Sequence, residues 1–279
     1  MEHTYVICAY QKSPFLEECI LSLKNQTVSS IILLATATPD PYLEELCSRY
    51  QIEYCVRDGQ PGIDADWNYA LSLAKTPYVT NAHQDDVYEP DYTEQIMRYA
   101  KAAAKGDKSR IPLILFCNYS ELIHGKKEQD RKNLGIKRRL LEPLKKTERQ
   151  GSVFWKRHVI RFGNAICCPS VTYHMETILM YMKADQKEKL FEEHFRSNLD
   201  WETWEWLSKK EGSFVFIPKY MLAHRIHEGS ETSATIREHQ RGKEDYQMFC
   251  KFWPGWIAKV LTAFYGQSEK DNSVGKEEK

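Results

Sequence analysis

The chain has 279 residues, of which 42% are hydrophobic and 12% aromatic; this ordinary globular composition predicts disorder only at the ends. Its length suits one large α/β domain, or a main domain with a helical extension. The 39 basic and 39 acidic residues give a formal net charge of zero, which argues against nucleic-acid binding through bulk electrostatics.

The first 118 residues alternate between predicted strands and predicted helices. Short apolar runs typical of buried parallel strands are followed by segments with apolar residues at helical spacing. The predicted strands cover residues 4–9, 31–35, 53–56, 77–82 and 113–117, and the predicted helices cover residues 14–26, 41–50, 64–75 and 91–105. This alternation predicts βαβ units with right-handed crossovers, and hence a mostly parallel, Rossmann-like sheet flanked by helices.

Residues 119–150 interrupt this alternation. Ten Lys and Arg residues between positions 126 and 149 interleave with leucines, and few acids accompany them. Most charge runs are solvated faces, and that remains one interpretation. The interleaved apolar residues also fit a flexible basic flap that faces a membrane surface or a pyrophosphate.

The remaining chain is expected to form three parts, residues 151–235, 236–266 and 267–279. The first contains an apolar run (165–173), an aromatic helix (200–210) and a strand (213–217). The second holds a charged helix near residues 233–250 and a short amphipathic helix at 253–265. The aromatic residues of that last helix suit an interfacial membrane anchor, although docking on the protein's own body is an equal alternative. The third part is expected to be a disordered tail.

Eight cysteines are scattered along the chain without Cys-x-x-Cys or Cys/His metal spacing. We interpret them as reduced thiols of a cytoplasmic protein and expect no zinc site. No apolar run reaches the roughly 18 residues of a membrane span. The N-terminus lacks the basic start and apolar core of a signal peptide, so we expect a soluble or peripheral protein.

Two adjacent carboxylates, Asp85 and Asp86, follow the predicted strand at 77–82. The carboxyl end of a strand is where open α/β sheets bind ligands. Neighbouring carboxylates repel unless a cation or solvent separates them, and Mg²⁺ commonly bridges such groups to nucleotide phosphates. A surface turn with an aspartate N-cap would satisfy the same residues. This segment alone leaves both interpretations open.

Several motifs stand in a characteristic order. They are residues 5–10 (Tyr-Val-Ile-Cys-Ala-Tyr), 15–27, 62–71 and 73–79, the Asp85-Asp86 segment up to Tyr92, Asp200-Trp201-Glu202-Thr203-Trp204, and Arg225-Ile226-His227. Together they resemble family 2 glycosyltransferases of the GT-A fold over roughly residues 4–235. The resemblance implies that residues 1–118 bind a nucleotide-diphospho-sugar donor and that residues 151–235 bind the acceptor. It implies a metal-dependent inverting transfer to a surface glycan or a lipid-linked saccharide, as in polysaccharide biosynthesis. The basic segment and the C-terminal aromatic helix motivate an acceptor near the inner face of the membrane.

The resemblance also assigns site residues. A divalent cation, Mn²⁺ or Mg²⁺, would stabilise the charge on the leaving diphosphate. The implied metal ligands are Asp85, Asp86 and His227, where Asp86 either ligates the ion or hydrogen-bonds a water bound to it. The implied donor-binding residues are Ala9, Tyr10, Thr36, Asn68, His83, Asp85, Arg225 and His227.

Asp200 is the expected catalytic base. An inverting displacement needs a base that takes the proton of the acceptor hydroxyl as it attacks the sugar. Asp200 stands where the family keeps this acid, and an N-cap of the helix from Trp201 is the alternative role. Trp201 and Trp204 fit either a sugar platform or core packing.

The chain departs from the family pattern at three positions. His83 replaces the first carboxylate of the Asp-x-Asp element, Trp67 replaces an arginine, and residues 35–40 (Ala-Thr-Ala-Thr-Pro-Asp) replace an acidic run that reads the nucleobase. The nucleobase therefore stays open. These departures also keep a catalytically silent glycan-binding or scaffold subunit as an alternative. A sugar-1-phosphate nucleotidyltransferase is less favoured, because residues 9–14 lack a glycine-rich phosphate loop.

Overall fold

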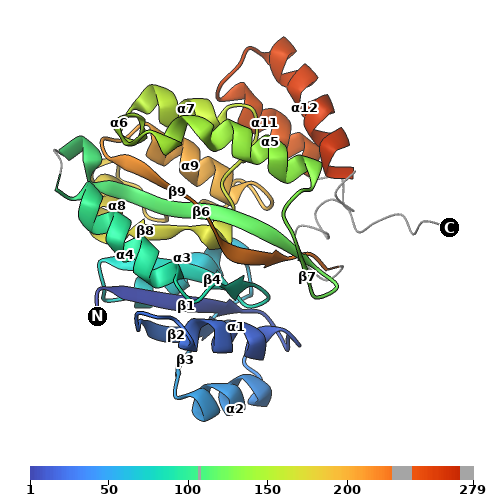
Figure 1. Ribbon diagram of the computed structural model, residues 1–279. Helices are drawn as coiled ribbons and strands as arrows, with labels where there is room; N and C mark the ends of the chain where they lie inside the picture. Colours follow the sequence, from blue (N-terminus) through green and yellow to red (C-terminus); the bar gives the residue numbers. More distant parts are fainter. Residues whose placement is uncertain (106–107, 228–240, 271–279) are drawn as a thin grey trace.

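In the computed structural model, a nine-stranded sheet runs through the part of the chain that the structure describes, residues 1–105, 108–227 and 241–270 (Figure 1). The strands are β1 (His3–Ala9), β2 (Ile31–Thr36), β3 (Glu53–Val56), β4 (Tyr78–His83), β5 (Val87–Tyr88), β6 (Pro112–Ile123), β7 (Lys126–Glu128), β8 (Thr172–His174) and β9 (Ser213–Arg225). Their order is β3-β2-β1-β4-β8-β6-β9-β5, and β7 pairs with β6. The mostly parallel sheet predicted from the sequence is confirmed.

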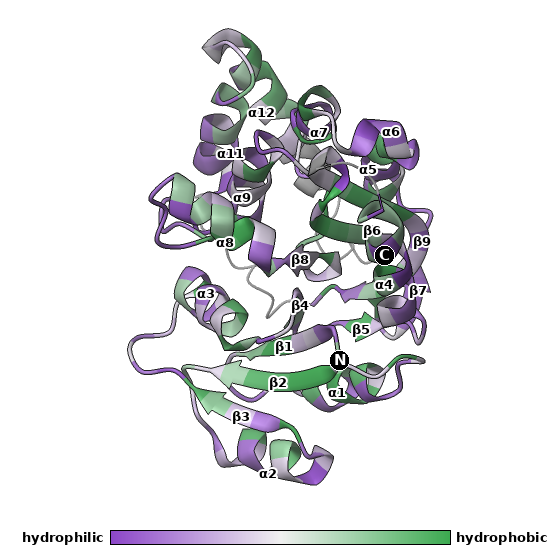
Figure 2. Ribbon diagram, turned by 90° about the vertical axis from the view of Figure 1, so that its left-hand side faces the viewer, coloured by the Kyte–Doolittle hydropathy of each residue, from purple (hydrophilic) through white to green (hydrophobic). Residues whose placement is uncertain are grey.

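Strands β3, β2, β1 and β4 form the parallel half that the sequence pattern predicts. The short strand β8 runs antiparallel to both β4 and β6, so β6 and its parallel neighbour β9 point in the same direction as β4. The sequence analysis did not predict β8, because this three-residue strand overlaps the end of a longer apolar run. Figure 2 shows the central strands β2 and β6 as hydrophobic, as expected for strands covered on both faces.

The helices of the first half begin and end close to the predicted positions. They are α1 (Leu16–Lys24), α2 (Pro41–Tyr50), α3 (Ile63–Leu73) and α4 (Tyr92–Ala103). Helix α2 shows why the prediction works, because Asp40 caps it by accepting a hydrogen bond from the backbone N–H of Tyr42 (2.8 Å), and Pro41 opens the first turn. It ends at Gln51, whose φ of 54° is left-handed.

The segment predicted as a flexible basic flap is built of regular elements. After β7 it forms α5 (Lys132–Leu141), a 3₁₀ turn (Glu142–Lys145) and the short α6 (Thr147–Gln150). Leu134, Leu141 and Leu144 are buried, so the leucines that interleave with the cations attach the segment to the body of the protein. Residues 126–150 therefore pack on the body of the protein, and whether this basic segment moves as a flexible flap over residues 119–150 stays a prediction.

Further helices follow in the second half of the chain. They are α7 (Val153–Ile160), α8 (Met175–Ala184), α9 (Leu199–Ser208), α11 (Arg241–Cys250) and α12 (Gly255–Lys270). Figure 1 shows α5, α7, α9, α11 and α12 gathered at the end of the molecule opposite α2. Residues 233–240 of the predicted charged helix and residues 271–279 of the predicted tail lie outside the described residues.

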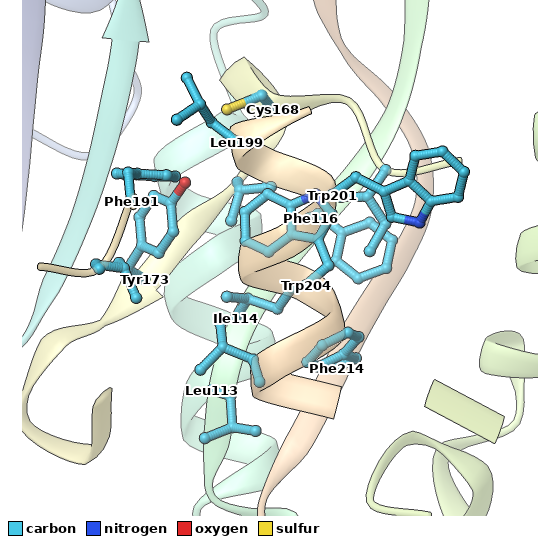
Figure 3. Close-up of a cluster of buried hydrophobic side chains, with 14 of the residues drawn as sticks. Leu113, Ile114, Phe116, Cys168, Tyr173, Phe191, Leu199, Trp201, Trp204 and Phe214 are labelled. Carbon is cyan, nitrogen blue, oxygen red and sulfur yellow. The ribbon is translucent and has the colours of Figure 1, made fainter. Parts of the chain in front are cut away.

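Trp201 and Trp204 of α9 lie in the centre of the larger hydrophobic core (Figure 3). Both side chains are fully buried. The Trp201 indole N–H donates to the Ile160 carbonyl at 2.9 Å, and the Trp204 ring stacks on Tyr173 at 5.9 Å. This burial decides against the sugar-platform alternative for both tryptophans.

The eight cysteines are unpaired thiols, and most of them are buried. No disulfide therefore links the cysteines, as their spacing in the sequence predicts. Among the described helices, none combines the length and the apolar character needed to cross a bilayer.

Truncation of the core at Phe216 tests this packing. Phe216 of β9 is buried and stacks on Phe116 of the neighbouring β6, with 5.4 Å between the ring centres. We expect Phe216→Ala to lower the free energy of unfolding by about 3–5 kcal/mol, measured by urea denaturation. Phe154→Ala removes a ring that is 60% exposed and should change the free energy of unfolding by less than about 0.5 kcal/mol. Equal effects of the two substitutions would contradict the assigned core.

Candidate active site

The carboxyl ends of β1, β2 and β4 meet at one edge of the sheet. The strand register pairs Ala9 with Thr36 and Cys8 with His83, so the predicted donor-binding residues of three strands lie side by side. Directly after β4 the chain turns sharply, and the backbone N–H of Asp86 donates to the His83 carbonyl at 3.3 Å. This turn places Gln84, Asp85 and Asp86 at the same edge.

Asp86 is a fully buried carboxylate that the end of β9 surrounds. It accepts a hydrogen bond from the backbone N–H of Arg225 (2.8 Å) and from Nδ1 of His224 (3.0 Å). Burial by itself lowers the pKa of His224, but the negative charge of Asp86 outweighs burial and raises that pKa to about 9. His224 therefore carries a positive charge at neutral pH and balances Asp86.

Asp85 is held by the two other polar residues of the same strand end. Its carboxylate accepts a hydrogen bond from Nε2 of His227 at 2.8 Å, and its carbonyl accepts one from Nε of Arg225 at 2.8 Å. The Arg225 guanidinium also pairs with Glu18 and lies over the Phe15 ring. Burial raises the pKa of Asp85, but the His227 hydrogen bond and the neighbouring imidazoles outweigh this and lower it. Asp85 is thus ionised at neutral pH.

His83 adds a nitrogen ligand to these carboxylates. Its Nε2 atom is buried and has no hydrogen-bond partner among the described residues. Burial lowers the pKa of His83, which keeps the imidazole neutral and its lone pair available. One ligand atom each from His83, Asp85 and Asp86 lies within 4.8 Å of the others. This donor set of one imidazole and two carboxylates fits a divalent cation such as Mn²⁺.

The two histidines lie differently around Asp85, and their roles toward a metal and a donor stay predictions. The resemblance places His227 on the metal and His83 on the donor. In the structure, His83 belongs to the three-residue group, whereas His227 hydrogen-bonds the Asp85 carboxylate. A histidine that bonds a ligating carboxylate orients that ligand, which is a common arrangement around metal sites.

Gln84, a residue that the sequence analysis passed over, fixes the first strand's end. Its side-chain amide donates to the Tyr10 carbonyl and accepts from the Tyr10 N–H, both at 3.1 Å. The Tyr10 ring itself is 54% exposed, beside the strand ends.

At the end of β2, Thr38 accepts a hydrogen bond from the Gln11 N–H (2.7 Å) and donates its own N–H to the buried Thr36 hydroxyl (3.0 Å). Hydroxyl groups thus stand where the family has an acidic residue.

Asn68 makes contacts other than those predicted. Its amide oxygen accepts from the backbone N–H groups of Leu190 and Phe191 (3.0 and 3.1 Å), and its amide nitrogen donates to the carbonyls of Asp64 and Phe191 (both 2.8 Å). These contacts are all to the protein's own backbone. The structure therefore gives Asn68 a positioning role, and its contact with the donor stays a prediction.

Asp200 lies in the first turn of α9, one residue after the helix begins at Leu199. The N-cap position belongs to Asn198, so the alternative role of Asp200 as the cap is not what the structure shows. The Asp200 carboxylate accepts from Asn164 (2.6 Å) and from the Trp201 N–H (2.7 Å). Burial raises its pKa although both hydrogen bonds oppose the rise. Its charge raises the pKa of His83, which places it within electrostatic reach of the His83 group.

The sheet thus places an acidic, histidine-containing group at its carboxyl edge, where open α/β sheets bind ligands. Residues 4–175 match the sequence model of "Glycosyl transferase family 2". The chain belongs to this family.

Two relatives agree with this assignment. The chain is 27% identical over 123 residues to EpsH of Bacillus subtilis (strain 168), which carries a provisional glycosyltransferase designation; the match covers 41% of this chain and 33% of EpsH. It is 24% identical over 245 residues to an uncharacterized glycosyltransferase of Haemophilus influenzae (strain ATCC 51907 / DSM 11121 / KW20 / Rd), covering 84% of this chain and 68% of the relative. The chain thus spans only a third of EpsH.

Solved structures share the fold at low sequence identity. S. aureus TarS 1-349 in complex with UDP-GlcNAc has a TM-score of 0.62 at 12% identity, covering 98% of this chain and 74% of that chain. The mannosyltransferase PcManGT from Pyrobaculum calidifontis, in complex with GDP-Man and Mn²⁺, has a TM-score of 0.61 at 12% identity, covering 97% and 70%. In a longer TarS structure the match, at a TM-score of 0.57, extends over 44% of that chain. These similarities establish the GT-A fold.

The buried pair of His224 and Asp86 predicts a pH-dependent stability. Because folding raises the pKa of His224 from 6.5 to about 9, its contribution is fully present below pH 6.5 and is lost as pH rises through 9. The shift corresponds to about 3 kcal/mol at most. We expect His224→Gln to be less stable than the wild type at pH 6 and the difference to shrink toward pH 9, measured by urea denaturation in EDTA. A difference that is constant with pH would contradict a charged His224.

Proposed function

We propose that the protein is a metal-dependent inverting glycosyltransferase that moves a sugar from a nucleotide-diphosphate donor to a surface-glycan or lipid-linked acceptor. The grouping of His83, Asp85 and Asp86 at the carboxyl edge of the sheet carries the proposal. The GDP-Man and Mn²⁺ in PcManGT and the UDP-GlcNAc in TarS, both of the same fold, support a nucleotide-sugar donor and a cation. These two donors differ in nucleobase and in sugar, so we propose neither a particular base nor a particular sugar for this protein.

The chain's own residues divide the work of donor binding. His83 and Asp85 would hold the cation, with Asp86 as the third ligand, and the bound cation would neutralise diphosphate charge. His227 orients Asp85, and Arg225 adds positive charge beside it. The exposed Tyr10 ring offers a stacking surface for the base or the ribose at the end of β1.

Asp200 is the proposed base for the acceptor hydroxyl. Its raised pKa makes the carboxylate a stronger proton acceptor than an exposed aspartate. The hydrogen bonds from Asn164 and the Trp201 N–H fix the direction in which its oxygens point. Because the base must be ionised to accept the proton, activity should rise with pH through the raised pKa of Asp200.

Helix α12 supports an acceptor at a membrane surface. Trp256, Val260 and Phe264 are 72%, 50% and 74% exposed and recur at a spacing of four, so they share one face of the helix. Residues 251–266 include two lysines and no acid. An exposed apolar face with aromatic rings and basic neighbours is typical of helices that lie on anionic bilayers. We place the protein peripherally at the inner face of a membrane.

Substitutions at Asp85 and Asp200 test the proposed chemistry. In the wild type, a nucleoside diphosphate at about 100 times its dissociation constant with Mn²⁺ should add about 2.7 kcal/mol of stability, seen as a thermal shift. Asp85→Ala should lose the Mn²⁺-dependent shift. Asp200→Asn should keep the shift and lower kcat for transfer by about 10²–10⁴.

Asp130→Ala, at an exposed aspartate after β7, is the matched control and should leave both measurements unchanged. Full transfer activity in Asp85→Ala would refute the metal assignment. A wild type that binds no nucleoside diphosphate with or without Mn²⁺ would instead favour a silent glycan-binding or scaffold subunit.

Vesicle binding tests the membrane face. The double variant Trp256→Ser/Phe264→Ser should bind vesicles of phosphatidylglycerol and phosphatidylcholine about a hundredfold more weakly than the wild type in a cosedimentation assay. The control Leu179→Ser/Met180→Ser alters two similarly exposed apolar residues on α8 and should bind as the wild type does. Equal losses in both variants, or no binding by the wild type, would refute the assignment of α12.

A further inference from the structure

The connection between α8 and α9 leads directly to Asp200. Within it, residues 190–198 form an irregular segment that ends one residue before α9 begins. Loops without regular hydrogen bonding are usually the least constrained parts of a domain. This segment is instead attached to the rest of the protein at both of its ends, by side chains from α3 and from α11.

The first anchor is Asn68 of α3. It bonds both the N–H groups of Leu190 and Phe191 and the Phe191 carbonyl, as described above. The Phe191 ring packs edge-on against Trp67 at 5.0 Å, and Trp67 in turn lies 5.1 Å from the His83 ring. The start of the segment is therefore fixed relative to the residue that completes the proposed metal group.

The second anchor is Glu244 of α11. Its carboxylate accepts hydrogen bonds from three consecutive backbone N–H groups, those of Arg196 (3.0 Å), Ser197 (2.8 Å) and Asn198 (3.2 Å). The neighbouring Asp245 accepts from the Asn198 side-chain amide at 2.8 Å. Both acids are buried. A buried carboxylate is tolerated only when its oxygens are hydrogen-bonded. The two acids therefore hold the backbone turn at residues 196–198, and the donors of the turn stabilise the buried acids.

Core packing already holds α9 in place, so we infer that Glu244 does more than stabilise the fold. Trp201 and Trp204 are buried in the core, and the Trp201 ring packs against Phe249 of α11 at 5.1 Å. Glu244 fixes the course of the backbone just before the helix, up to Asn198, which is two residues before Asp200. Small displacements of a catalytic group reduce rates strongly, so this path bears on catalysis more than on folding.

We propose that Glu244 and Asn68 are positioning residues that fix Asp200 relative to His83, by holding residues 190–198 at both ends. This inference rests on the proposed role of Asp200 as the base. It assigns a catalytic task to α11, which lies outside the residues 4–175 that match the family. It also explains why the Asn68 side-chain amide hydrogen-bonds the backbone of a segment that is distant in sequence.

Glu244→Gln tests the second anchor. The glutamine keeps the size of the side chain but presents an NH₂ group to backbone N–H donors and removes the charge. We expect kcat for transfer to fall by about tenfold or more, with donor KM and the Mn²⁺-dependent thermal shift unchanged. Hydrogen–deuterium exchange of the peptide that covers residues 196–198 should become faster, because its amides lose their acceptors.

Glu202→Gln is the matched control. Glu202 lies on α9 and pairs with Lys251, just after α11, and its other oxygen lies 3.8 Å from the exposed His194 ring, whereas the 196–198 amides donate to Glu244. It should leave kcat within about twofold and exchange unchanged. Asp245→Asn leaves Glu244 in place and should show the same effects as Glu244→Gln to a smaller extent. It replaces Glu244→Gln as the test variant if Glu244→Gln does not fold.

Two results would overturn the inference. One is exchange at residues 196–198 that is as slow in the Glu244 variant as in the Glu202 control. The other is faster exchange with kcat unchanged, which would show that Asp200 does not depend on the turn. An inactive wild type refutes the proposed function instead, and the exchange comparison then still decides whether Glu244 holds the turn.

Discussion

The site depends on one buried carboxylate, Asp86, at the point where the two halves of the sheet meet. It follows β4 of the first half and accepts hydrogen bonds from the backbone of Arg225 and the ring of His224 at the end of β9. A buried negative charge is stable only with such partners, so the end of β9 must lie against the β4 turn. This contact brings Arg225 and His227 to Asp85, and thereby assembles residues that are about 140 positions apart in sequence.

A second set of contacts connects this group to the segment that leads to the proposed base. Trp67 lies between the rings of His83 and Phe191, and Asn68 holds the backbone of the same segment that leads to Asp200. The donor side and the acceptor side are therefore connected through packed rings and hydrogen bonds rather than through open loops. The family match ends at residue 175. Asp200 lies beyond this point, and so do the acids of α11 that bind the turn before Asp200.

Local patterns predicted most of the first half correctly because its elements depend on local physics. Apolar runs, an aspartate cap and a proline at a helix start determined strands and helices such as α2 without knowledge of the rest of the chain. The basic segment was different. Its mixture of cations and leucines left a solvated face and a flexible flap as alternatives, whereas the structure buries three of the leucines against the body of the protein, and charge patterning does not report such burial. Residues such as Gln84, Asn164 and Glu244 carry no motif, so the sequence alone gave no reason to select them.

By itself, the sequence determined the class of fold, the edge of the sheet where ligands bind and the chemical types gathered there, because strand-end carboxylates and motif order are local features. The tertiary structure decided where each of these residues lies and which groups it contacts. It placed His83 among the proposed metal ligands, set His227 to bond Asp85, buried Trp201 and Trp204, and turned the amide of Asn68 toward the protein's own backbone. The reason is physical: ligation, orientation and burial are properties of distances between segments, and those distances follow from packing rather than from spacing along the chain.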